Sequence, residues 1–194
     1  NFDRSRNRWS SIDGGIDYQR SFPVKNRLLT LSYKINSNPS DDEDEYAYHD
    51  IDGVAAWQDY LHMLKDQRHE QDGNSLEQTF QIDYTTPFAK IHTLEAGLKY
   101  IMRDNHSNDD RYTREALSAA DYAYDEANSS HYKHTNVIFA GYLGYGVKWN
   151  LLSGRLGLRY EHTLQDVKYR LGRGEDFRKN FDDFVPSASF GVRV

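Results

Sequence analysis

Polar and apolar residues alternate along most of the chain with a period of two. Between Leu29 and Ile35, for example, every odd position is apolar and every even position is polar. Successive side chains of a β-strand point to opposite faces, so the pattern predicts strands with one apolar and one polar face. Seven strands are predicted in this way, over residues 10–22, 29–35, 76–84, 91–103, 136–149, 155–165 and 184–194.

The connections between these strands alternate strictly between short and long. Residues 23–26, 86–90 and 150–154 form the short ones, and residues 36–74, 104–135 and 166–183 the long ones. An antiparallel up-and-down meander places all short turns at one edge, as outer-membrane barrels do with their periplasmic turns. The predicted fold is therefore all-β, a meander of seven strands forming part of a transmembrane β-barrel. Residues 46–51 offer an eighth strand.

Aromatic residues favour the same interpretation, because amphipathic rings collect where apolar and aqueous phases meet. Those beside the predicted short turns are Phe22, Phe88 and Trp149, and those approaching the long loops are Tyr33, Tyr100 and Tyr160. The two sets are typical of the aromatic girdles of a membrane barrel. The general preference of aromatic residues for strands is the alternative explanation.

The polar faces of the strands carry too much charge for a packed core. They include Glu95, Lys99, Arg103, Arg155, Arg159 and Glu161. Buried charges need partners or water, and a wet barrel lumen supplies both. A small barrel with its apolar face inward and its charged face in bulk water fits the alternation equally well, so the pattern alone leaves both arrangements open.

Two segments of the long loops depart from strand periodicity. Apolar residues of 54–71 and of 114–128 recur at helical spacing, which predicts a short surface helix in each. Neither segment is apolar enough to form a second domain. Residues 1–194 are therefore interpreted as a single β-barrel segment with decorated loops.

Composition narrows the class of protein further. The 194 residues are 38% hydrophobic and 14% aromatic, with a mean hydropathy of -0.88, and no uninterrupted apolar run exceeds four residues. A transmembrane helix and the apolar core of a signal peptide are thereby excluded. The net charge of -6 has the wrong sign for wrapping nucleic acid. With no cysteine, disulfides, thiolate metal sites and cysteine nucleophiles are excluded as well.

Candidate metal ligands do not combine into a site. His62 and His69 are about two helical turns apart, and His131 and His134 fall on opposite faces of a predicted strand. The acidic run 41–45 lacks the interleaved glycine and the distant glutamate of a calcium loop, so it is interpreted as solvated loop charge. No metal and no cofactor are predicted.

Catalytic motifs are missing from the sequence too. There is no nucleophile elbow, zinc-protease motif or phosphate loop, and nothing separates the pKa values of the adjacent Asp109 and Asp110 for acid–base work. Gly141, Gly144 and Gly146 lie within a predicted strand, where they are interpreted as close-packing or bend positions. We expect no enzymatic activity and name no catalytic residue.

Several stretches resemble a known family. Residues 96–100, 157–161 and 185–189, together with the hairpin entry at 81–87, are similar in order and spacing to consecutive barrel strands of TonB-dependent receptors. The resemblance covers roughly residues 75–194. It implies a Gram-negative outer-membrane location, a 22-stranded barrel around an N-terminal plug, and import of a nutrient with energy from TonB. The implied partners are the lipid bilayer, the plug, TonB and an unknown nutrient ligand.

The chain departs from that family pattern in three ways. It has no recognisable plug, it has too few strands, and its last strand lacks the usual terminal aromatic residue. It is expected to be about a third of a larger barrel, which as an excised piece should close into a small barrel or pair edge to edge as a homodimer. Alternatives are a complete small outer-membrane barrel for adhesion or structure, and a soluble ligand-binding barrel. Ligand-binding residues stay unknown; Tyr122, Tyr124 and the run 41–45 are the first to examine.

Overall fold

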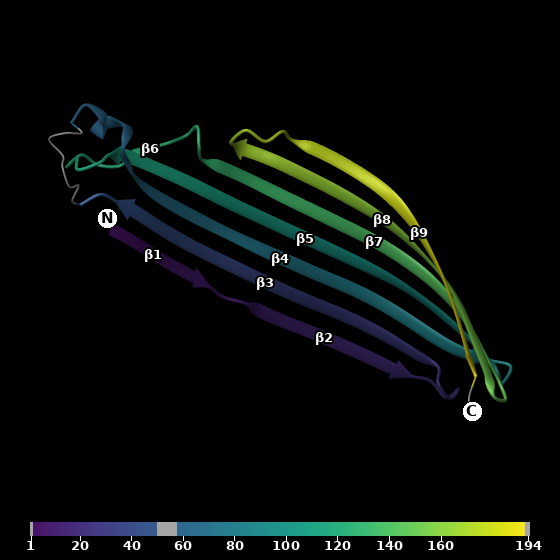
Figure 1. The fold of residues 1–194 in the computed structure, drawn as a ribbon. Coiled ribbons are helices and arrows are strands. Elements are labelled where there is room, and N and C mark those ends of the chain that lie inside the picture. Colours follow the sequence, from purple (N-terminus) through teal and green to yellow (C-terminus); the bar gives the residue numbers. More distant parts are fainter. Residues whose placement is uncertain (1, 50–57, 193–194) are drawn as a thin grey trace.

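The computed structural model describes residues 2–49 and 58–192, which form one antiparallel sheet (Figure 1). Its strands are β1 (Phe2–Trp9), β2 (Ile12–Ser21), β3 (Leu28–Ala47), β4 (Lys65–Phe88), β5 (His92–Glu115), β6 (Ala123–Tyr124), β7 (Ser130–Trp149), β8 (Leu152–Leu171) and β9 (Phe177–Val192). A short 3-10 helix, η1 (Gln58–Met63), precedes β4. Among the described residues, no helix is both long and apolar enough to cross a membrane.

The strands follow one another across the sheet in the order β1-β3-β4-β5-β7-β8-β9. β2 also pairs with β3, so β1 and β2 are two parts of one strand interrupted at residues 10–11. β6 is a two-residue addition to β5. The sheet is therefore seven strands wide, and the predicted all-β antiparallel meander is confirmed.

The two sets of connections predicted from the sequence lie at opposite ends of the sheet (Figure 1). The turns at one end are residues 22–27, 89–91 and 150–151, and the connections at the other end are 48–64, 116–129 and 172–176. The predicted long loop 166–183 is wrong, because β8 continues to Leu171 and β9 begins at Phe177, which leaves a connection of five residues. In the tightest turns the backbone takes the left-handed conformation, with φ of 47° at Ala89, 54° at Lys90 and 56° at Asn150. Two consecutive residues with positive φ match the right-handed twist of the flanking strands.

The strands are much longer than the sequence pattern predicts. Most of the predicted loops 36–74 and 104–135 is strand, since β3 continues to Ala47, β4 begins at Lys65, β5 continues to Glu115 and β7 begins at Ser130. Both faces of these extensions are polar, so the alternation that marks a half-buried strand disappears there. Backbone pairing continues without it, from Leu28↔Thr85 to Tyr46↔Gln67 between β3 and β4.

The two helices predicted in the long loops are largely wrong. Within 54–71, only residues 58–63 are helical and residues from Lys65 onward belong to β4; residues 54–57 lie outside the described part. Residues 114–128 contain the end of β5, turns and β6 instead of a helix. The predicted eighth strand at 46–51 is wrong where it can be followed, since Tyr46 and Ala47 end β3 and Asp50 and Ile51 lie outside the described residues.

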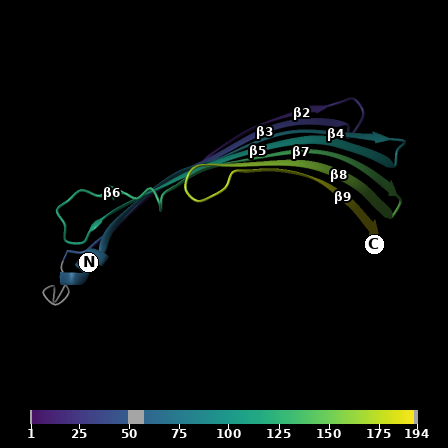
Figure 2. The ribbon, with the colours of Figure 1, turned by 90° about the horizontal axis from the view of Figure 1, so that it is seen from above.

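The sheet is bent into an arc and stays open (Figure 2). One edge is formed by β1 and β2 and the other by β9, and among the described residues these edges do not pair with each other. The expected closure into a small barrel is therefore wrong for the isolated chain, because seven strands with this curvature do not meet. Edge-to-edge dimerisation stays a prediction.

The sheet has almost no interior. Among the described residues, the buried apolar side chains are Ala47, Ile101, Ala116, Ala140 and Val167. Large apolar side chains along the strands are exposed instead, for example Leu98 at 49%, Leu143 at 62% and, on the edge strand β9, Phe184 at 68%. A face of this size needs an apolar covering that the chain does not supply.

Candidate functional site

The apolar side chains gather on one face of the sheet, the outer face. Strand register places residues side by side in rows that run across the strands. One row reads Ile16, Tyr33, Phe80, Tyr100 and Phe139, and the next reads Tyr18, Leu31, Ile82, Leu98, Gly141, Tyr160 and Phe184. Ring centroids lie 4.5 Å apart for Tyr33 and Phe80 and 5.0 Å apart for Tyr160 and Phe184. The aromatic residues predicted near the long loops thus form part of a continuous band.

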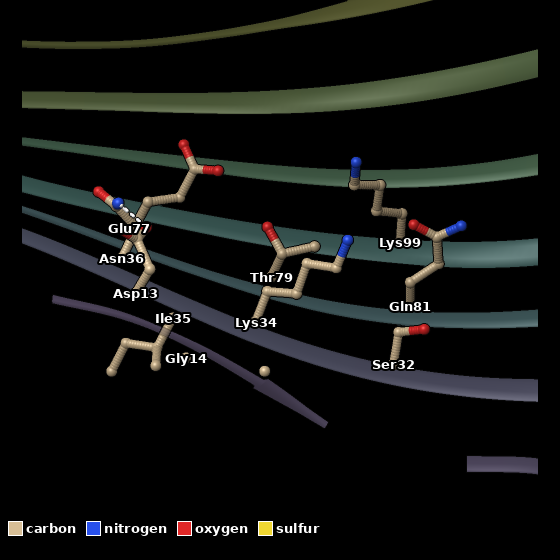
Figure 3. A pocket seen from close by; sticks show the side chains of 11 residues that line it. Asp13, Gly14, Ser32, Lys34, Ile35, Asn36, Glu77, Thr79, Gln81 and Lys99 are labelled. Carbon is tan, nitrogen blue, oxygen red and sulfur yellow. Dashed lines mark hydrogen bonds between the residues drawn. The ribbon is translucent and has the colours of Figure 1, made fainter. Parts of the chain in front are cut away.

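The opposite, inner face is polar along the same stretch. A hollow on this face has a volume of about 670 Å³ and is lined by side chains of β2, β3, β4 and β5 (Figure 3). Glu77 is held by Arg103, whose Nε donates to Oε2 at 2.6 Å, and Asp13 accepts hydrogen bonds from Ser11 and Asn36. Lys34 and Lys99 point into the hollow, and neither forms a hydrogen bond or ion pair within the described residues. The hollow therefore presents two lysines without an ion pair, next to the Asp13 carboxylate, which has only neutral hydrogen-bond donors as partners.

The inner face is shaped by a glycine that an aromatic ring covers. The ring of Tyr142 on β7 lies across Gly97 on β5, and the Tyr142 hydroxyl donates a hydrogen bond to the Asp83 carboxylate on β4. A Cβ at Gly97 would lie 2.5 Å from Cζ of Tyr142, which is closer than real carbon atoms approach. This contact ties three neighbouring strands together. It gives Gly97 a packing role that sequence spacing did not show.

Beyond the apolar band, cross-strand polar contacts replace apolar ones. Lys133 Nζ lies 2.8 Å from Asp104 Oδ2, His131 Nε2 lies 2.8 Å from Asp110 Oδ1, and His69 Nε2 lies 2.8 Å from Asp109 Oδ1. Asp109 and Asp110 thus each hold a histidine of a neighbouring strand. Among the described residues, no group of three or more His, Cys, Asp or Glu side chains is placed to hold a metal ion.

The acidic run 41–45 is part of β3, so its interpretation as loop charge is wrong. Because it is a strand, its carboxylates alternate between the two faces. Arg8 lies opposite Asp41, Arg6 opposite Glu43 and Arg4 opposite Glu45. Opposite charges on directly paired positions contribute about 0.2–1 kcal/mol per pair. The matching spacing of arginines at 4, 6 and 8 was the sequence signal for this pairing.

A cluster of arginine, tyrosine and carboxylate side chains, the latch, fixes the long connection 116–129 to the strand ends. Asp66 is 1% exposed and accepts hydrogen bonds from Arg114 Nε at 2.8 Å and from the Tyr48 backbone N–H at 2.9 Å. The Arg114 guanidinium lies 4.4 Å from the ring centroid of Tyr122, whose hydroxyl donates to Glu45 Oε1 at 3.0 Å. Arg68 completes the latch, 4.6 Å from the Tyr112 ring.

The residues singled out as ligand contacts are only partly brought together. Tyr122 meets Glu45 of the acidic run, whereas Tyr124 donates to Asp110 at 3.0 Å and packs on Tyr112 at 5.4 Å. Both tyrosines lie over outer-face positions, on the side opposite to the polar hollow. Their visible role is to hold the long connection in place, and contact with a ligand stays a prediction.

Tyr122 should resist ionisation. Burial, together with the hydrogen bond to the Glu45 carboxylate, raises the pKa of Tyr122 to about 12. A tyrosine whose pKa is raised in the folded state contributes stability below its ordinary value near 10, and loses that contribution as pH rises through 12. Absorbance at 295 nm is titrated for the wild type and for Tyr122→Phe. The difference between the two curves is expected to show one phenol ionising near pH 12. A difference titration centred at pH 10 would contradict the buried hydrogen bond.

These features define a class of protein. A curved antiparallel sheet with an exposed apolar face, a charged inner face, and two long connections at the end opposite the short turns is the wall of a membrane-spanning β-barrel. The chain belongs to the outer membrane protein beta-barrel family, whose model matches residues 20–193. Its place is therefore the cell outer membrane, and the alternative of a soluble barrel is wrong.

A solved structure shows the same fold. BauA, the ferric preacinetobactin receptor from Acinetobacter baumannii, aligns with a TM-score of 0.56 at 7% identity over 98% of this chain and 28% of that chain. The ferric citrate transporter FecA in its unliganded form aligns with a TM-score of 0.48 at 11% identity, over 87% of this chain and 25% of FecA. The chain thus spans about a quarter of each receptor. No curated protein matches its sequence.

Proposed function

We propose that this chain is part of the barrel of a TonB-dependent receptor that takes up a nutrient across the outer membrane. The observation that carries the proposal is the similarity in fold to the BauA receptor, which covers 98% of this chain at a TM-score of 0.56. The open edges support it, because β1, β2 and β9 leave backbone groups for further strands of a larger barrel. A complete small barrel would have closed on itself. Receptor barrels of this kind work in transport, and we propose no catalytic activity.

The polar hollow on the inner face supports the proposal that the barrel lumen is filled. Lys34 and Lys99 lie at the level of the apolar band, in register with Thr79 and Gln81 of β4. Unpaired charges on the inner wall are stable only against water or against groups that compensate them. A plug that fills the barrel and a nutrient that passes through it are the partners we propose for this face, with TonB acting on the plug. The chemical identity of the nutrient is left open.

The proposal is tested by uptake in cells that carry the full-length protein. We expect loss of the gene and loss of TonB each to abolish uptake of the same labelled compound, drawn from a panel of metal chelates, sugars and peptides. Uptake that persists without TonB would contradict the proposal. Loss of surface adhesion with every uptake unchanged would favour a structural barrel instead.

The lysines of the hollow provide a residue-level test. In the full-length receptor, Lys34→Gln with Lys99→Gln is expected to reduce uptake by about tenfold or more, because a hydrogen bond to a charged group contributes roughly 1.5–3 kcal/mol. Lys25→Gln, which removes one positive charge by the same substitution in the short turn between β2 and β3, is the control and should leave uptake unchanged. Equal uptake in all three proteins would show that the hollow takes no part in transport.

A further inference from the structure

The hollow on the inner face carries charges of both signs, and they lie toward opposite ends of it (Figure 3). Asp13 is at one end, beside Asn36 of β3. Lys34 lies two residues further along β3, and Lys99 lies at the other end, beside Gln81 of β4. With strands about 4.8 Å apart and residues about 3.3 Å apart, the Cα atom of Asp13 is roughly 8 Å from that of Lys34 and roughly 20 Å from that of Lys99. A ligand that meets both kinds of charge must therefore be longer than one amino acid.

Several other charges of the inner face have partners among neighbouring side chains. Three ion pairs show this, namely Glu77 with Arg103, Glu95 with Arg155 and Glu161 with Arg159. The carboxylate of Asp83, which lies diagonally from Lys99, accepts hydrogen bonds from Tyr142 and Gln81. Within the described residues, neither Lys34 nor Lys99 has such a partner, and Asp13 has no cation. The hollow is therefore a place where the wall leaves charges of both signs without an ion pair.

The charged groups of the hollow keep free hydrogen-bonding capacity. The Asp13 carboxylate accepts from the Ser11 hydroxyl at 3.1 Å and from the Asn36 amide, which uses two of its roughly four acceptor sites. Each lysine ammonium has three N–H donors. The stem of Lys34 lies along the bare backbone of Gly15, where a Cβ would meet Lys34 Cγ at 3.5 Å. The free acceptor sites of Asp13 suit a ligand's ammonium group, and the lysines suit a carboxylate.

Neutral hydrogen-bonding groups line the hollow together with these charges. They belong to Ser32, Thr79 and Gln81. The Gln81 amide nitrogen donates to Asp83 at 2.7 Å, so its carbonyl oxygen is left as an acceptor. The two hydroxyls both donate and accept. Such groups match the alternating N–H and C=O groups of a peptide backbone.

The spacing of the charges indicates the length and the class of the ligand. The midpoint between the two lysines is roughly 14 Å from Asp13 at the level of the backbone. An extended tripeptide spans about 10 Å, and the side chains of the wall cover the remaining distance. An anionic metal chelate would leave Asp13 without a partner, and an uncharged sugar would leave all three charges without one. A short peptide meets all of them.

We propose that this hollow binds a short peptide, about three residues long, by its two free termini. The terminal ammonium donates to the Asp13 carboxylate, and the terminal carboxylate accepts from Lys34 and Lys99. The neutral side chains of the hollow meet the peptide backbone, so the site tolerates many peptide sequences. This inference rests on the proposed function, because it names the class of nutrient that the receptor takes up.

The test uses the purified full-length receptor in detergent, equilibrated with a library of tripeptides whose retained members are identified by mass spectrometry. The tightest is then titrated by calorimetry with free termini, with an acetylated N-terminus and with an amidated C-terminus. Each block is expected to weaken binding to the wild type about tenfold, because each removes hydrogen bonds between charged groups. In Asp13→Asn acetylation should cost nothing further, and in Lys34→Gln with Lys99→Gln amidation should cost nothing further. Asp17→Asn is the matched control, since Asp17 lies on the same strand and face but outside the lining of the hollow.

Each outcome decides the proposal. Retention of no tripeptide would overturn it, as would equal affinity of the wild type for free and blocked peptides, or equal losses in Asp13→Asn and Asp17→Asn. TonB-dependent uptake of a metal chelate or a sugar that the substitutions leave unchanged would overturn the peptide assignment and leave the proposed function standing. Peptide binding as expected, with uptake that does not depend on TonB, would support the site and contradict the proposed function.

Discussion

Replacing Asp66 by Ala is expected to free the connection 116–129 from the end of the sheet. Asp66 is almost fully buried and joins Arg114 to the Tyr48 backbone, so its loss leaves a guanidinium and an N–H without their acceptor. Removing one partner of a buried ion pair costs about 3–5 kcal/mol, and the partial exposure of Arg114 points to the lower end. We expect local stability to fall by about 3 kcal/mol, seen as roughly hundredfold faster hydrogen exchange in this segment.

Two further variants distinguish the effect of losing the latch contacts from the effect of simply removing a carboxylate. Asp121→Ala removes a carboxylate from the same connection but no latch contact, and exchange should stay unchanged. Asp66→Asn keeps an acceptor oxygen and should fall between the wild type and Asp66→Ala. If Asp66→Ala left the exchange of residues 116–129 as slow as in the wild type, the latch would not be what holds this connection.

Replacing Gly97 by Val is expected to have the largest effect on the barrel wall itself. The new side chain would occupy the space of the Tyr142 ring and separate its hydroxyl from Asp83, disturbing β4, β5 and β7 together. Overpacking of this kind costs about 1–3 kcal/mol for one added group, and a branched side chain adds to that. Urea unfolding of the full-length barrel in detergent should show a lower free energy of unfolding. A semi-native gel should show a smaller fraction of folded molecules.

The glycine experiment has a matched control on the same face. A Cβ at Gly146 of β7 would meet its nearest atoms at 3.9 Å, so Gly146→Ala should change stability by less than about 0.5 kcal/mol. In a Tyr142→Ala background, the cost of Gly97→Ala should shrink, because the ring it displaces is gone. Equal costs with and without the ring would contradict the proposed contact.

How much of the fold the sequence predicts depends on where the apolar band lies. Within the band, one face of the sheet is apolar and the other is polar, so alternating apolar residues such as Leu29 and Leu31 predict the strand. Beyond the band, both faces of the sheet are polar and meet water. On β5 the stretch from Asp104 to Asp109 is entirely polar, with residues that disfavour strands, yet it pairs on both sides with β4 and β7. Long-range backbone pairing decided the structure there.

The candidate site was harder to predict for a related reason. The alternation of polar and apolar residues correctly predicted that Lys99 and Glu95 lie on the inner wall, because this alternation is visible within a single strand. The latch unites Glu45, Asp66 and Tyr122, which are distant in the sequence, and no local pattern relates them. Its tyrosine was noticed only as a polar aromatic residue in a loop, and its arginine partners were missed.

The outer face of the long strands is expected to meet lipid only as far as the apolar band and then to continue into water. Single cysteines along β5 of the full-length protein in vesicles test it directly, since residues 1–194 contain no cysteine of their own. With a fluorophore attached, Leu98→Cys and Tyr100→Cys should be quenched from the lipid phase, and Lys99→Cys, His106→Cys and Asp110→Cys from water. Lipid quenching at Lys99 in place of Leu98, or equal quenching at all five positions, would contradict it.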